Sequence, residues 1–157
     1  MPEAYFNLGA ALANSRHVVE AAQRFVEAKQ RYPLGSEKWA QVTAWAFSML
    51  TEEECAEVAK PEWWNDEGLK ALSARVVRAA PGDAQANQMR AAVLRGQCPV
   101  REAGPRSAAE LRKAATHYER AAALCPAPAV KADDASRAEM CRRLADAIES
   151  GRHVVVV

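Results

Sequence analysis

The stretch that decides the fold covers residues 2–34 and reads PEAYFNLGAALANSRHVVEAAQRFVEAKQRYPL. Its small and large apolar residues fall at two sets of helical spacings, which marks one face of each of two helices. Between them, Asn14 and Ser15 can turn the chain and cap a second helix over about 17–31. Pro33 closes that helix. The stretch therefore predicts a helical hairpin.

The sizes of the apolar residues explain how the two helices can pack closely. Gly9 and Ala21 leave room for the backbones, and larger side chains fill the space around them. Eight positions carry the pattern, namely Tyr5, Leu8, Gly9, Leu12, Ala21, Phe25, Ala28 and Pro33. With this spacing the stretch resembles a tetratricopeptide repeat, a helical hairpin of about 34 residues. The resemblance implies an all-α fold in which antiparallel hairpins stack as a short right-handed superhelix.

The second half of another unit lies further along the chain. Its spacing repeats that of the second helix of the first unit, in Ala114, Tyr118, Ala121 and Pro126. The first helix of this unit is predicted over 84–96, with Ala91 and Leu94 in the places of Gly9 and Leu12. Residues 97–106 are an insertion whose prolines and glycine indicate an irregular loop. Ser107 and Glu110 then form a capping box for the returning helix.

The unit between these two is more divergent. A helix is predicted over 36–50, and a capping box from Thr51 to Glu54 indicates a short helix that ends near residue 59. The next residues, 63–66, read WWND and form a connection. A further helix over 67–80 carries an apolar stripe of Leu69, Leu72 and Val76. This unit thus looks like a repeat with extra residues inside it.

The last predicted helix, over 133–150, has an apolar side and a charged side. Such a helix can close the apolar end of a repeat stack. The sequence therefore predicts a single domain over 1–150, with about seven helices plus a short connecting helix. Its units cover 2–35, 36–83, 84–126 and the cap helix 133–150, and a valine-rich tail covers 151–157.

Composition and motifs exclude several classes of function. The formal net charge is +1, so no global field attracts nucleic acid or an acidic membrane. No apolar stretch reaches the ~20 residues that a membrane span needs. Cys55, Cys98, Cys125 and Cys141 lack the spacing of a metal or redox motif, and reduced thiols are expected unless the compartment is oxidising. No catalytic, phosphate-binding or metal-binding motif occurs, and we expect no enzymatic activity, no cofactor and no metal.

The resemblance implies a function in protein binding, because stacked hairpins of this family usually accept a peptide or helix in a concave groove. The groove residues are expected on the first helix of each unit, offset from the core stripe. They are Phe6, Ala10, Ala13, Ala40, Ala44, Phe47, Gln85, Gln88 and Arg95. The adjacent Trp63 and Trp64 either fill the space between helices or offer an aromatic anchor to a partner.

We therefore expect a non-enzymatic scaffold or adaptor that binds a protein or peptide. The alternative is a structural subunit of a larger assembly that contacts its neighbours through its edges and tail. The tail can add a strand to a partner, pack on the cap helix or serve as a C-terminal ligand. A soluble intracellular protein is expected, in the cytoplasm or in an organelle.

Overall fold

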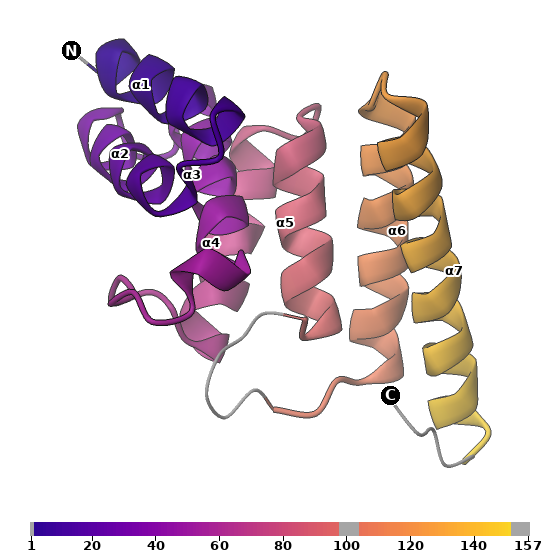
Figure 1. Ribbon diagram of the computed structural model, residues 1–157. Helices are drawn as coiled ribbons and strands as arrows, with labels where there is room; N and C mark the ends of the chain where they lie inside the picture. Colours follow the sequence, from indigo (N-terminus) through magenta and orange to yellow (C-terminus); the bar gives the residue numbers. More distant parts are fainter. Residues whose placement is uncertain (1, 98–103, 152–157) are drawn as a thin grey trace.

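Helices account for most of the chain in the computed structural model, which describes residues 2–97 and 104–151. The described residues form seven α-helices and one short 3-10 helix, so the all-helical prediction is confirmed. The elements are α1 (Pro2–Asn14), α2 (Val18–Arg31), α3 (Glu37–Leu50), η1 (Glu53–Cys55), α4 (Asp66–Ala79), α5 (Ala84–Arg95), α6 (Ala108–Leu124) and α7 (Pro128–Glu149). Each α-helix packs on the next one along the chain, and α3 also contacts α5. The helices thus follow one another from α1 at one end to α7 at the other (Figure 1).

Side-chain caps set the beginnings of several helices. Ser107 accepts a hydrogen bond from the Glu110 N–H, and the Glu110 carboxylate accepts one from the Ser107 N–H, so the predicted capping box is confirmed. Ser36, Asn65 and Asp83 cap α3, α4 and α5 in the same way, each accepting from a backbone N–H three residues later. These caps satisfy amide groups that have no partner inside a helix.

Three predicted helix boundaries were wrong. The Ser15 hydroxyl donates to the Ala11 carbonyl at 2.7 Å, so it belongs to the end of α1 and does not cap α2. The Thr51 hydroxyl donates to the Ser48 carbonyl at 2.7 Å, so Thr51 ends α3 and does not cap a helix after it. Between Thr51 and α4, only Glu53–Cys55 is helical. Helix α7 begins at Pro128, five residues before the prediction, because proline needs no N–H partner in a first turn.

The core runs through the whole stack. Phe25 of α2 lies against Val42 of α3, and the other side of α3 places Trp39 in a cluster with α4 and α5. A further cluster joins α5, α6 and α7 and includes Tyr118. Leu8 was expected on the core face of α1, but it is 46% exposed because α1 packs mainly on α2. The middle helix α3 is consequently covered on two sides, and α1 on one.

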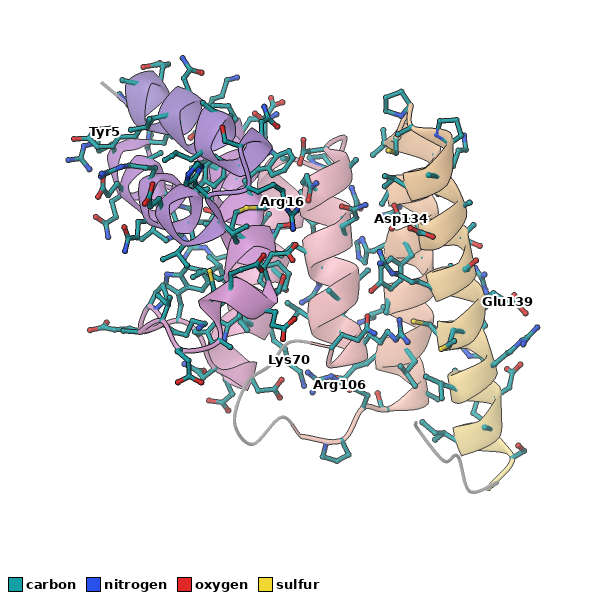
Figure 2. All side chains as sticks on the ribbon, in the orientation of Figure 1. Tyr5, Arg16, Lys70, Arg106, Asp134 and Glu139 are labelled. Carbon is teal, nitrogen blue, oxygen red and sulfur yellow. The ribbon has the colours of Figure 1, made fainter. Side chains whose placement is uncertain are left out.

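An ion-pair network joins the start of α6 to α4. The Arg106 guanidinium donates to both carboxylate oxygens of Asp66, at 2.5 and 3.1 Å, and to the Val93 carbonyl at 3.0 Å. Lys70 pairs with Glu110 at 2.9 Å. Figure 2 shows Lys70 and Arg106 near the same end of the helices. The predicted insertion 97–106 is therefore anchored where it enters α6.

Several predictions fall outside the described residues. They concern the valine tail from residue 152 on, and Cys98 with the middle of the insertion. In the part that is described, no helix combines the length and the apolar character that a membrane crossing requires.

Candidate functional site

A polar concavity of about 360 Å³ opens between α3, α5, α6 and α7. Its walls combine amide, hydroxyl and apolar side chains. The lining residues are Phe47, Ser48, Thr51, Gln85, Gln88, Met89, Ala92, Gln97, Tyr118 and Arg137. We call this hollow the polar concavity.

One side of the polar concavity is held by a buried carboxylate on α7. Asp134 is fully buried and accepts a hydrogen bond from the Gln88 side-chain amide at 2.8 Å. Arg137 pairs with the other oxygen of the same carboxylate at 3.5 Å. Burial raises the pKa of Asp134, and these two donors oppose that shift. The network links α5 to α7 and fixes the Gln88 amide, whose carbonyl oxygen remains available to accept.

The apolar wall is equally well supported. Phe47 is 4% exposed, and its ring centroid lies 5.5 Å from that of Trp64. Tyr118 is buried on α6, and its hydroxyl donates to the Gln97 side-chain carbonyl at 3.4 Å. Burial raises the pKa of Tyr118, so the phenol stays neutral and remains a donor at physiological pH. The wall therefore places nearly buried aromatic rings beside fixed polar groups.

The structure brings three of the predicted groove residues together, namely Phe47, Gln85 and Gln88. The sequence reasoning missed the other lining residues. Met89 and Ala92 could have been found, because they lie four and seven residues after Gln85 and hence on one face of α5. Ser48 and Thr51 could also have been found, because they lie four residues after Ala44 and Phe47. The other lining residues, Gln97, Tyr118 and Arg137, come from another helix or from a helix end, and no local spacing indicates them.

Two of the predicted groove residues are core residues instead. Ala40 is 0% exposed and Ala44 is 1% exposed, and both pack in the cluster formed with α4 and α5. The prediction assumed that one face of α3 is covered and the next one is free. Because α2 covers one side of α3 while α4 and α5 cover another, these alanines have no access to a ligand.

The remaining groove predictions lie away from the polar concavity. Phe6, Ala10 and Ala13 of α1 are partly buried against the cluster of α2 and α3. Phe6 also lines a separate small pocket of about 190 Å³ with Tyr32. Arg95 reaches α7, where its Nη2 lies 3.2 Å from the Met140 sulfur.

The two adjacent tryptophans take part in packing. Their ring centroids lie 5.8 Å apart, and Trp64 covers Phe47 from behind. Trp63 is partly buried and lines an open apolar pocket of about 550 Å³ beside Val26 and Leu50. The connection that carries both residues thus closes the space between α2, α3 and α4.

Titratable groups in the described part of the chain give no metal site, since no group of three or more His, Cys, Asp or Glu residues could hold an ion there. Cys55 and Cys141 are buried free thiols, and burial raises the pKa of each. Burial, aided by the charges of Arg120 and Arg90, lowers the pKa of His117 to about 4. The His117 ring is therefore neutral near pH 7.

Comparisons with protein-family models, with curated proteins and with solved structures gave no match for this chain. The resemblance to tetratricopeptide repeats thus stays a prediction, which rests on the residues of the first and third units.

Proposed function

We propose that this protein is a non-enzymatic scaffold that binds an extended segment of a partner protein in the polar concavity. The observation that carries the proposal is the lining of that hollow by the first helices of successive hairpins, α3 and α5, together with α7. This is the surface that a tetratricopeptide-like superhelix would present to a ligand. The superhelical arrangement is part of the proposal.

The chemistry of the walls favours an extended, largely uncharged peptide. Gln85 and Gln97 have side-chain amides, and Ser48 has a hydroxyl, which can pair with backbone N–H and C=O groups of a ligand. The Arg137 charge is balanced by Asp134, so no strong charge selects the ligand. Phe47 and Met89 line the floor but are only 4% and 1% exposed, so recognition rests mainly on the amide and hydroxyl groups.

Capture of partners with paired variants tests the proposal. Ser48→Arg and Gln85→Arg place long cations in the concavity at half-buried positions, where little of the core is disturbed. Ala71→Arg is the matched control, because Ala71 is exposed on α4 and does not line the hollow. Partners recovered with the wild type and the control should be lost with the two concavity variants.

Loss of partners is informative only if the variant proteins are folded. Circular dichroism at 222 nm should give equal helical signals and similar melting curves for all variants. If folded Ser48→Arg and Gln85→Arg proteins recover the same partners as the wild type, binding through the polar concavity is wrong.

A second function, as a structural subunit of a larger assembly, is favoured by one side of α7. Three apolar side chains on this helix are well exposed, with 38% for Val130, 51% for Met140 and 45% for Ile148. They lie at helical spacings on one side, where a neighbouring subunit could cover them. Light scattering after size exclusion separates this function from the first, because Met140→Glu should then abolish an assembly that Ser48→Arg leaves intact.

A further inference from the structure

A second concavity of about 360 Å³ lies between α4, α5 and α6. The residue of α5 that lines this hollow is Arg90. Arg90 is two residues from both Gln88 and Ala92, so it lies roughly 200° around the helix from each of them. The hollow therefore opens on the other side of α5 from the polar concavity. The lining residues are Ala74, Val77, Arg90, Lys113, Thr116, His117 and Arg120. We call this hollow the basic concavity.

Positive charge dominates the basic concavity. Thr116 and His117 lie three and four residues after Lys113, and Arg120 lies four and three residues after them, so the four residues share one face of α6. Among the described residues, neither Lys113 nor Arg120 forms an ion pair with a carboxylate. Helix α4 contributes only Ala74 and Val77 to the lining. The hollow thus contains three permanent cations and no acidic side chain.

Arg90 is held in place at the floor of the basic concavity. Its Nη1 donates to the Lys70 carbonyl at 2.9 Å and to the Ser73 hydroxyl at 3.0 Å. Both acceptors are neutral, and Nη2 remains as a further donor. The negative charge of Glu110 acts on Arg90. The Glu110 carboxylate, however, already pairs with Lys70 and accepts a hydrogen bond from the Ser107 N–H. The guanidinium is therefore fixed without a counter-charge of its own.

His117 adds a polar group whose orientation is set by neighbours. The Asn87 amide donates to the carbonyls of Pro81 and Asp83, at 3.0 and 2.9 Å, which turns its oxygen toward the imidazole. The His117 Nδ1 lies 3.0 Å from that oxygen and donates to it. The second ring nitrogen, Nε2, is left for a ligand, and it can donate only when it carries a proton.

We infer that the basic concavity binds a phosphate-bearing ligand through Arg90, Lys113 and Arg120, with Thr116 and His117 completing the site. Phosphate suits these groups because guanidinium and ammonium donors pair with its several acceptor oxygens. Lys113 and Arg120 are seven residues apart, about 10.5 Å along the helix axis. A ligand with two linked phosphoryl groups can contact both ends of the hollow, whereas a single phosphate reaches both only if the two side chains converge.

Binding of the anion should favour protonation of the His117 imidazole. Burial and the charges of Arg120 and Arg90 oppose protonation of the imidazole, and an anion bound beside these cations offsets their two charges. The NMR titration of the His117 ring should move to higher pH when pyrophosphate is added.

The test uses the full chain with pyrophosphate and with inorganic phosphate as probes, in low salt, by isothermal titration calorimetry and NMR. We expect pyrophosphate to bind, with shifts concentrated at Thr116 and His117, and to bind more tightly than phosphate. Lys113→Gln with Arg120→Gln should weaken binding by at least about tenfold, because two charge-assisted contacts are lost. Both side chains are exposed, so the fold should persist.

Lys38→Gln is the matched control, since Lys38 is exposed on α3 and lies outside the basic concavity. It should leave pyrophosphate affinity unchanged. Equal weakening by Lys38→Gln and by the double variant, or no binding of pyrophosphate to the wild type at millimolar concentration, would overturn the proposal.

A phosphate group can come from a soluble compound or from a lipid headgroup. Flotation with phosphatidylcholine vesicles, with and without a phosphorylated phosphatidylinositol, separates the two sources. Pyrophosphate binding without flotation assigns the site to a soluble ligand, and flotation that is lost in the double variant assigns it to a headgroup. Flotation that persists in the double variant would contradict a role of the basic concavity in lipid binding.

Discussion

Gly9→Ala should destabilise the protein, although alanine normally stabilises a helix relative to glycine. In an exposed helix the exchange gains about 1 kcal/mol. At Gly9 an added Cβ would lie 2.9 Å from both Cδ1 and Cε1 of Phe25 and 3.3 Å from its Cγ. Phe25 is 1% exposed and has ring neighbours on either side, so its ring has little room to move. Overpacking of this kind costs about 1–3 kcal/mol, so the net effect should be a loss of roughly 0–2 kcal/mol.

Urea denaturation followed by circular dichroism at 222 nm measures this effect. Because α1 packs mainly on α2 and can open locally, amide hydrogen exchange of α1 should accompany it. Gly82→Ala is the control, because an added Cβ there meets nothing within 4 Å, and it should stabilise by about 0.4–1 kcal/mol. In a Phe25→Leu background, where the clash is smaller, Gly9→Ala should cost less. A full gain of about 1 kcal/mol for Gly9→Ala in the wild-type background would refute the close approach of α1 to Phe25.

Three further outcomes follow from the described contacts. Asp66→Asn should cost about 2 kcal/mol in urea unfolding, because it removes the negative charge with which the poorly exposed Arg106 guanidinium pairs. The hydrogen bond from Arg106 lowers the pKa of Asp66, so the wild type should lose this stability as the pH falls below about 4, and Asp66→Asn should lack that loss. Iodoacetamide labelling with mass spectrometry should modify the partly exposed Cys125 in the native protein and spare the buried Cys55, and equal labelling would contradict that burial. Since the pKa of His117 is lowered to about 4, unfolding free energy should decline as the pH falls from about 6.5 toward 4, and an unchanged slope in His117→Gln would exclude this residue as the cause.

Local patterns in the sequence predicted much of the fold. The stripe of Leu69, Leu72 and Val76 and the capping box of Ser107 and Glu110 act over three to seven residues, and the structure contains all of them as predicted. The short helix after Thr51 was wrong, because the same hydroxyl can bond forward as a cap or backward to a carbonyl. Only the tertiary arrangement decides between the two.

The candidate site could be predicted in part. Gln85 and Gln88 were found because successive turns of α5 place them on one side. Ala40 and Ala44 were misplaced because periodicity gives the relative directions of side chains but not the number of helices that surround α3. The contribution of Arg137 could not be predicted either, because it depends on the pairing of α7 with α5 through Asp134, 46 residues from Gln88.

The basic concavity could not be predicted from the net charge of the chain. A net charge of +1 gives no indication of a charged surface. Lys113 and Arg120 share one face of α6, while acidic residues elsewhere balance their charges in the sum. Helical spacing of Lys113 and Arg120 was present in the sequence, but the third cation, Arg90, lies on another helix.

The most direct test of the central proposal is an NMR titration of the isotopically labelled chain with a peptide selected for binding from a random library displayed on phage. Binding in the polar concavity predicts that amide shifts concentrate there, at Ser48, Gln85, Ala92 and Gln97, and that Gln85→Arg abolishes them while Ala71→Arg does not. Selected peptides whose shifts map to another surface, with unchanged affinity for folded Gln85→Arg, would contradict it.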